Sequence, residues 1–410
     1  MKAILPSMVL LCFANFATAA DWPRFLGPAQ TGVSAETELN LNWEKHPPAV
    51  LWRYKTGSSY SPPVVAAGKL YVFHRRRNEE VLDALDAQTG IRLWRHSYAT
   101  TYKDRYGYSN GPRGSPTVDG DLVLIFGTEG RLRCLEASDG SLRWEREVNR
   151  EFNVPQNFFG AGTAPVVYDD RVMINAGGKD GHGVMAFSLH TGKTLWTATD
   201  DAASYATPIT LDVSGTPALA CLTRSHLRVL GIADGTEVCA YPFRAEVNES
   251  VNAASPVRVG DSLLITAAYK VGSALIGANS AAEVWRSQTA LEGHWATPIF
   301  HDGYIYGCHG RHESGADIRC LDAKDGRVAW KSPRGLGRST LLMVQEHIIV
   351  LGERGHVALL EVTPNAYTEV SRRKNVLGHP AWAPPVVANG LLYLRDEHQV
   401  VCLDLRPPQQ

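Results

Sequence analysis

Ten polar or aromatic residues stand just before eight copies of one short phrase and could form a binding site. They are Tyr60, Asn110, Arg113, Asn157, Tyr205, Asn252, His294, Trp295, Arg338 and Trp382. Aromatic walls with a few directing donors are typical of a ligand pocket. Arg113 and Arg338 carry planar forks that could hold a carboxylate or phosphate, and His294 is the candidate general base. In the alternative interpretation, these side chains fill a channel and bond neighbouring elements.

Other groups that could do chemistry form weaker patterns. His309 and His312 have a spacing seen in metal sites, but no third ligand accompanies them. Residues 246–249 and 200–201 are rich in carboxylates that could bind calcium, yet both fall in predicted connections where exposed acids are ordinary. We therefore predict no metal site and assign no catalytic residue.

The phrase that orders these residues is a small residue, proline and an aliphatic pair, followed by a turn and an aliphatic strand. Its aligned positions are Pro63, Pro116, Pro165, Pro208, Pro256, Pro298, Leu341 and Pro385. A period of about 40–50 residues with several short strands is typical of a β-propeller. Proline suits the innermost strand, whose edge faces the channel, because it has no N–H to pair. The residues before each copy would then meet at one mouth of that channel.

Each repeat has room for four strands, and the sixth shows them clearly. Strands are predicted at residues 298–300, 304–307, 317–322 and 327–330. A turn glycine precedes a tryptophan by four residues in several repeats, as in Gly326 and Trp330. A large ring at a fixed place on an outer strand can dock onto the next blade. We predict an all-β, eight-bladed propeller with four-stranded antiparallel blades.

The two ends of the chain indicate how the ring closes. The last repeat supplies three strands, and the missing fourth, with its tryptophan, appears at residues 50–54. The N-terminal strand should therefore close the last blade, which leaves no open seam. We assign residues 50–408 to the propeller, 21–49 to an N-terminal extension and 1–20 to a signal peptide.

The first twenty residues have the features of a secretory leader. Lys2 precedes an apolar run, and small residues follow at 17–20. A periplasmic or secreted protein is expected, and no other segment is apolar enough to span a membrane. The formal net charge of −1 gives no electrostatic case for a nucleic-acid partner. A monomer is expected, and the pairing of the cysteines is left open.

Several segments resemble the pyrroloquinoline-quinone-type repeat family. The stretch at residues 84–94, Ala-Leu-Asp-Ala-Gln-Thr-Gly-Ile-Arg-Leu-Trp, is similar to its repeat. Residues 21–28, Asp-Trp-Pro-Arg-Phe-Leu-Gly-Pro, resemble the N-terminal signature of its exported members. The resemblance implies the propeller fold and two classes of function. Some members are dehydrogenases that hold the quinone and calcium in the channel, and others are scaffolds for outer-membrane-protein assembly.

The chain lacks features of the quinoprotein alcohol dehydrogenases. It has no adjacent cysteine pair and no long insert between repeats. We therefore expect an exported, non-catalytic binding or scaffold propeller with a protein partner in the cell envelope and no firmly predicted cofactor. The alternative is an oxidoreductase that uses pyrroloquinoline quinone with calcium to oxidise an alcohol or sugar.

Overall fold

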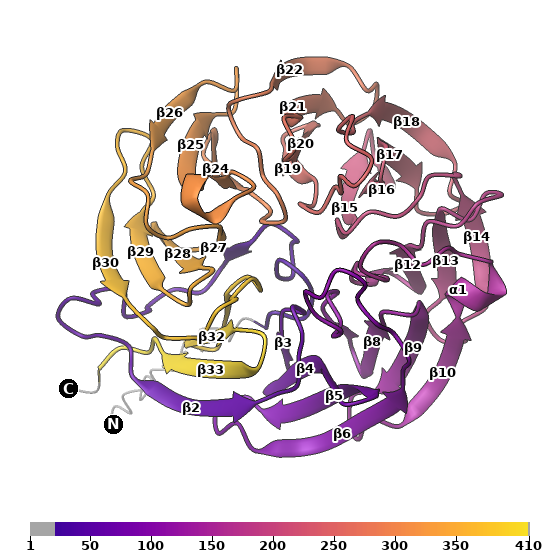
Figure 1. The fold of residues 1–410 in the computed structure, drawn as a ribbon, viewed down its shortest axis with the longest axis horizontal. Coiled ribbons are helices and arrows are strands. Elements are labelled where there is room, and N and C mark those ends of the chain that lie inside the picture. The colour runs from indigo at the N-terminus through magenta and orange to yellow at the C-terminus, as the bar shows by residue number, and fades with distance from the viewer. Residues whose placement is uncertain (1–20, 409–410) are drawn as a thin grey trace, which may run out of the picture.

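The computed structural model describes residues 21–408, which form eight sheets arranged as blades around a ring (Figure 1). Seven sheets have four strands, and the seventh blade carries a fifth. Neighbouring strands within each blade's four-stranded core are antiparallel. The prediction of an eight-bladed, all-β propeller is confirmed.

The first four blades follow one another along the chain, and each begins with its innermost strand. Blade 1 contains β3 (Val64–Ala66), β4 (Lys69–Arg76), β5 (Glu79–Asp86) and β6 (Arg92–Ala99). Blade 2 contains β7 (Thr117–Asp119), β8 (Leu122–Phe126), β9 (Arg131–Glu136) and β10 (Leu142–Glu147), followed by the short helix α1 (Val148–Glu151). Blade 3 contains β11 (Val166–Tyr168), β12 (Arg171–Asn175), β13 (Val184–Ser188) and β14 (Thr194–Ala198). Blade 4 contains β15 (Ile209–Val213), β16 (Thr216–Leu222), β17 (His226–Gly231) and β18 (Glu237–Pro242).

The remaining blades continue the ring. Blade 5 contains β19 (Val257–Val259), β20 (Ser262–Ala267), β21 (Gly272–Gly277) and β22 (Glu283–Ser287). Blade 6 contains β23 (Ile299–His301), β24 (Tyr304–His309), the 3-10 turn η1 (Glu313–Gly315), β25 (Asp317–Asp322) and β26 (Val328–Lys331). Blade 7 contains β27 (Ser339–Val344), β28 (His347–Gly352), β29 (Val357–Glu361), β30 (Glu369–Arg373) and the added β1 (Val33–Ser34). Blade 8 contains β31 (Val386–Ala388), β32 (Leu391–Arg395), β33 (Gln399–Asp404) and β2 (Val50–Lys55).

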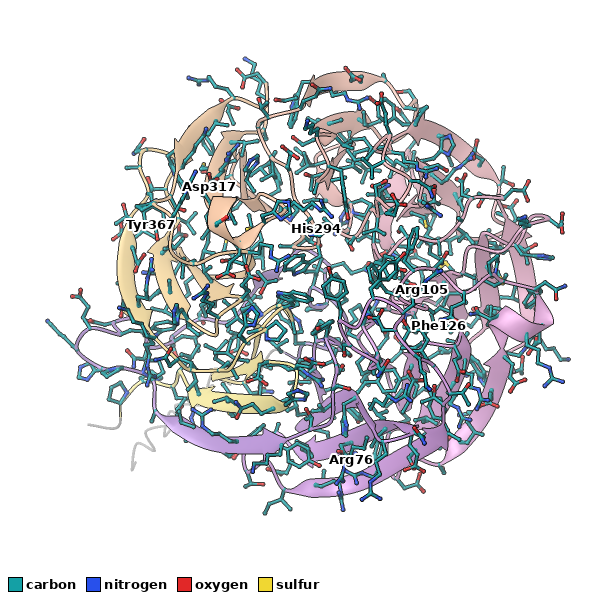
Figure 2. The ribbon with its side chains drawn as sticks, in the orientation of Figure 1. Arg76, Arg105, Phe126, His294, Asp317 and Tyr367 are labelled. Carbon is teal, nitrogen blue, oxygen red and sulfur yellow. The ribbon has the colours of Figure 1, made fainter. Side chains whose placement is uncertain are left out.

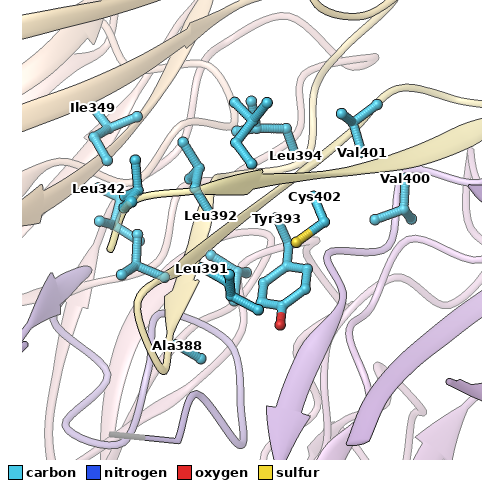
Figure 3. Packing of buried hydrophobic residues seen from close by; sticks show 14 of the residues in the cluster. Leu342, Ile349, Ala388, Leu391, Leu392, Tyr393, Leu394, Val400, Val401 and Cys402 are labelled. Atoms are coloured by element: carbon cyan, nitrogen blue, oxygen red, sulfur yellow. The ribbon is translucent and has the colours of Figure 1, made fainter. Parts of the chain in front are cut away.

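The ring closes through β2, as the sequence predicts. Strand β2 pairs antiparallel with β33, so Trp52 faces Cys402 on the outer side of blade 8. The largest buried cluster spans this blade and its neighbours and includes Leu342, Ile349 and Leu392, all fully buried (Figure 3). Joining the first and last strands in one sheet buries apolar surface that either end alone would expose.

The repeated tryptophans join each blade to the next. The indole Nε1 of Trp94 donates to Ala137 O of blade 2 at 3.2 Å, and Trp196 Nε1 donates to Ile232 O at 2.9 Å. Equivalent bonds are made by Trp144, Trp285 and Trp330. This docking confirms the predicted structural role of the outer-strand tryptophans.

In the repeats that have it, the turn glycine also belongs to this seam. Gly140 has a φ of +76°, and a Cβ on it would lie 2.5 Å from the Trp94 ring. Gly90 stands in the same way against Trp52, where the last blade meets the first. The glycine therefore receives the indole of the preceding blade, and the same turn favours its left-handed backbone conformation.

Three seams depart from this pattern, and at the seam after blade 7 the tryptophan slot holds Ser371, opposite Leu359. Blade 4 has Cys239 in the tryptophan slot, and its Sγ still contacts Ala278 O at 3.2 Å. At the closure, Tyr393 Oη donates to Ala87 O at 3.0 Å, while the buried Trp52 Nε1 has no partner among the described residues. The cysteines of residues 21–408 are all free, and five of the six are buried.

The first part of the N-terminal extension, residues 21–34, forms a strap that crosses the channel near the ring centre in Figure 1. Trp22 pairs with Val65 of blade 1, and β1 pairs in parallel with β27 at Met343 and Val344 of blade 7. Between these ends the strap bonds to the innermost strands or their turns at Val118, Val167, Pro208, Thr210 and Arg258. The strap therefore closes the channel below the mouth, because these partners lie at or after the proline slot, whereas the mouth residues precede it.

No helix within residues 21–408 has the length and apolar character needed to cross a bilayer. The predicted signal peptide, residues 1–20, lies outside the described residues.

Candidate functional site

A cavity of about 320 Å³ opens at the predicted mouth of the channel. Its size is at the lower end of ligand pockets, about 300–1,000 Å³. Many of its lining residues are aromatic: Tyr60, Tyr106, Tyr108, Phe158, Phe159, Tyr205, Tyr269, Trp295 and Trp382. The strap residues Phe25 and Leu26 line it as well, together with Pro62, Leu341 and Pro384 at the starts of three repeats. Since the strap crosses beneath the mouth, it forms the floor of a pocket that is open on one side.

Seven of the ten residues predicted from the sequence line this cavity. They are Tyr60, Arg113, Tyr205, His294, Trp295, Arg338 and Trp382. Figure 2 shows His294 near the centre of the ring, whereas Arg76 and Tyr367 lie toward its periphery. The antiparallel blades place the connection before each innermost strand at the same end of the ring, which brings these distant residues together.

The three asparagines do not belong to the lining. Asn252 is buried, and its Nδ2 donates to Thr223 O at 2.9 Å and to Phe243 O at 3.0 Å. Asn110 Oδ1 accepts from the Asp104 backbone N–H at 2.7 Å, and Asn157 accepts from Arg105 through its main-chain oxygen at 3.5 Å. For Asn110 and Asn252, the short amide side chain bonds to nearby backbone groups in place of facing the channel.

The fork of Arg113 is already engaged by protein groups. Its Nη2 donates to Asp104 Oδ2 at 3.0 Å and to Ser109 O at 3.2 Å, and its Nη1 donates to Phe159 O at 2.9 Å. Its guanidinium also lies 5.3 Å from the Phe159 ring centre. Arg113 therefore ties two mouth loops together, and few of its donors remain for a ligand.

Arg338 is neutralised by a buried acid. Its Nη2 donates to Glu353 Oε2 at 2.6 Å, and its backbone N–H donates to Oε1 at 2.8 Å. Burial would raise the pKa of Glu353, but the hydrogen bonds from Arg338 outweigh burial and keep that pKa below its ordinary value. The same guanidinium covers the rings of Trp295 and Trp382 at 4.7 and 5.1 Å. This pair orients the two tryptophans of the mouth.

His294 is held neutral. Burial, together with the charges of Arg338 and Arg311, lowers its pKa to about 3. Its Nδ1 is buried and has no partner among residues 21–408, and Tyr269 Oη lies 3.4 Å from its Nε2. A histidine with so low a pKa is a weak base at neutral pH. The predicted general-base candidate is therefore poorly suited to remove a proton.

Sequence reasoning missed Tyr269 and Arg311, which also line the cavity. Tyr269 lies between β20 and β21, and Arg311 between β24 and β25. In an antiparallel blade the link from the second to the third strand returns to the end at which the first strand begins. This alternation of strand direction could have placed both residues at the mouth from the sequence. Phe25 and Leu26 could not be found in this way, because no repeat marks the path of the strap.

A family model described as outer membrane protein assembly factor BamB matches residues 77–332 of this chain. The chain belongs to this family of propellers with PQQ-like repeats. Among curated relatives, the BamB protein of Burkholderia pseudomallei (strain K96243) is 28% identical over 188 residues, which cover 45% of this chain and 43% of that protein. The match thus spans less than half of that relative.

Relatives of this BamB-family chain also include enzymes. The 1-butanol dehydrogenase (cytochrome c) of Thauera butanivorans is 27% identical over 194 residues, which cover 42% of this chain and 25% of that protein. The crystal structure of quinohemoprotein alcohol dehydrogenase from Comamonas testosteroni superposes with a TM-score of 0.70 at 13% identity and covers 95% of this chain and 81% of that one. The superposition shows a shared fold.

The mouth does not fit a quinone held with calcium. Calcium takes six to eight oxygen ligands, and among residues 21–408 the one carboxylate that lines the cavity is that of Glu249. Glu313, Glu353 and His379 bring their ligand atoms within 4.8 Å of one another, but Arg354 and Arg338 already bind the two acids. Within residues 21–408, His309 and His312 belong to no group of three possible metal ligands, and His309 Nδ1 already accepts from the Glu292 N–H at 3.0 Å. No step through a quinone follows from these residues.

Proposed function

We propose that this BamB-family propeller is an exported, non-catalytic binding protein of the cell envelope that holds a partner protein at its aromatic mouth. One observation carries the proposal: the mouth presents aromatic rings, whereas the three charged or basic groups that the sequence predicts there are paired with an acid or kept uncharged. Arg113 is paired with Asp104, Arg338 with Glu353, and His294 is neutral. Membership of a family named for outer membrane protein assembly supports an envelope partner, and the leader-like first twenty residues support export.

Site-specific photo-cross-linking in the producing cells tests this function. A benzoylphenylalanine in place of the exposed Tyr108 should form an adduct with an envelope protein, identified by mass spectrometry. The matched control is the same substitution at Val284, which is 54% exposed on β22 at the outer side of blade 5. Adducts of equal yield at both positions, or none at Tyr108, would contradict a binding function of the mouth.

The alternative function is a quinone-dependent oxidoreductase, and it is favoured by the similarity to 1-butanol dehydrogenase. Titration with pyrroloquinoline quinone and calcium separates the two functions. We expect no shift of the unfolding temperature and no dye reduction with alcohols or sugars. A micromolar quinone complex that Arg338→Ala weakens would instead establish the enzyme.

A further inference from the structure

Three arginines around the mouth differ from Arg113 and Arg338. Those two pair with Asp104 and Glu353, whereas Arg105, Arg224 and Arg311 have no carboxylate partner within the described part of the chain. This difference leaves a positive field at the mouth of a protein whose formal net charge is only −1.

Each unpaired arginine lies against a ring of the cavity wall. Arg311 is 4.3 Å from the Tyr269 ring centre, Arg224 is 4.8 Å from that of Phe158, and Arg105 is 5.6 Å from that of Phe158 (Figure 2 labels Arg105). Arg224 Nη2 donates to Asn248 O at 2.6 Å and Arg105 Nη2 donates to Asn157 O at 3.5 Å. Stacking on an aromatic face leaves the remaining edge N–H groups of a guanidinium accessible to an acceptor.

Nearby charges do not cancel this field. Burial and the charge of Arg244 lower the pKa of Arg224, and Glu249 opposes them without reversing the shift. Glu249 is also the one acid among the cavity-lining residues within 21–408. An anionic group approaching the mouth would therefore find more positive than negative charge.

The apolar surface extends beyond the cavity. Tyr106 and Tyr108 line the cavity and are nevertheless 46% and 57% exposed, on the loop that leads from β6 to β7. Exposed aromatic residues beside a pocket indicate an interaction surface larger than a small ligand would cover. The strap closes the pocket from below, so that a group can enter it only from the mouth.

We propose that the mouth binds a polypeptide segment in which an aromatic residue, inserted into the cavity, is flanked by acidic residues that pair with Arg105, Arg224 and Arg311. This inference rests on the proposed function and names the chemistry of the partner. The cavity selects the ring by burial of apolar surface, and the unpaired arginines select its acidic neighbours by charge.

Fluorescence anisotropy with synthetic peptides on the full propeller tests the proposal. The probe is a labelled peptide, Gly-Asp-Glu-Phe-Glu-Asp-Gly. Its controls replace Phe with Ala, or replace the four acids with Lys. We expect the acidic aromatic peptide to bind at least about 10-fold more tightly than either control. Its affinity should fall when the salt rises from about 50 to about 300 mM.

Variants locate the contact. Each of Arg105→Gln, Arg224→Gln and Arg311→Gln should weaken binding about 3- to 5-fold. The triple variant should weaken it about 30-fold or more. Arg327→Gln is the matched control, because Arg327 is 75% exposed on the turn before β26 and away from the cavity lining. Ala253→Phe fills the cavity and should weaken binding about 10-fold or more, whereas the exposed Ala282→Phe before β22 should not.

Two results would overturn the inference and leave the proposed function intact. In the first, the acidic and the lysine peptides bind with equal affinity. In the second, the triple variant binds the acidic peptide as tightly as the wild type. In both cases Ala253→Phe still weakens binding. Binding of the isolated anionic dye anilinonaphthalene sulfonate as tightly as the acidic peptide would also overturn it, since a small ligand would then suffice. Failure of every peptide together with no adduct at Tyr108 would instead reject the proposed function itself.

Discussion

The tryptophans of the seams and those of the mouth show two uses of one residue type. In the seams, Trp196 is 8% exposed, bonds through Nε1 to the next blade at 2.9 Å and packs against the turn glycine Gly235. At the mouth, the buried Nε1 of Trp295 has no partner among residues 21–408, and its ring contacts Trp382 and Arg338. The seam ring packs on a surface that recurs from blade to blade, whereas the mouth ring packs on side chains that do not recur in the other repeats.

Stability and binding therefore depend on different regions of the propeller. A ring that fills a seam contributes apolar burial and a backbone hydrogen bond in several successive blades. A ring at the mouth leaves part of its surface for a partner and depends on Glu353, through Arg338, for its orientation. Substitutions in the two regions should therefore separate folding from binding.

The largest effect is expected from removing a seam ring. Trp196→Ala should lower the free energy of unfolding by about 3–5 kcal/mol, because it opens a cavity between blades 3 and 4. Trp295→Ala should cost roughly 1–2 kcal/mol, since its ring is only partly buried. Urea denaturation followed by circular dichroism measures both. Equal losses would remove the distinction between seam and mouth.

A smaller effect is expected from crowding a seam ring. Gly140→Ala places a Cβ 2.5 Å from the Trp94 ring and should cost about 2–3 kcal/mol. Gly120→Ala is the matched control, since Gly120 has a φ of +54° and open space around its Cβ position. The control should lose only about 1 kcal/mol, from its backbone conformation. Thermal unfolding of both variants checks this, and similar losses would mean that the seam tolerates the extra methyl group.

The smallest effect concerns the mouth and depends on pH. The folded-state pKa of His294, about 3, lies below its unfolded value, so the unfolded chain binds more protons between these two pH values. The contribution of His294 to stability is complete above about pH 6.5 and is lost as the pH falls toward 3. His294→Gln should remove roughly 2 kcal/mol of the loss between about pH 6.5 and pH 5. Denaturation midpoints for both proteins across this range test it, and parallel pH profiles would show that His294 is more solvated than its surroundings indicate.

Much of the fold could be predicted because each repeat carries its own strand, turn and tryptophan positions. In blade 6, the strand predicted at residues 317–322 coincides with β25, and the first, second and fourth strands differ only at their ends. Turn glycines and tryptophans mark the same places in several blades, and the short aliphatic runs between them form strands that are buried along their length. The closing strand was visible because its tryptophan filled the one slot missing from the last repeat.

The candidate site was only partly predictable. Position relative to the repeat located Tyr60, Trp295 and Trp382, because every innermost strand starts at the same end of the ring. It did not tell whether an arginine there was free or bound by a buried acid. Asp104 and Glu353 come from segments that the repeat pattern does not relate to Arg113 or Arg338. Asn252 donates to backbone carbonyls that come near it only in the folded loops.

By itself, the sequence determined the eight blades, their strand order, the seams and the closure, since each depends on residues that are near in the chain or recur at a constant period. Only the tertiary structure determined which charged side chains at the mouth lack an oppositely charged partner, and which segment closes the channel beneath it. Charge neutralisation and the path of the strap depend on contacts between residues that are distant in the chain or unrelated by the repeat, such as Gln30 with Thr210 and Arg113 with Phe159. The energies of such contacts follow from distance and burial, which no periodic pattern records.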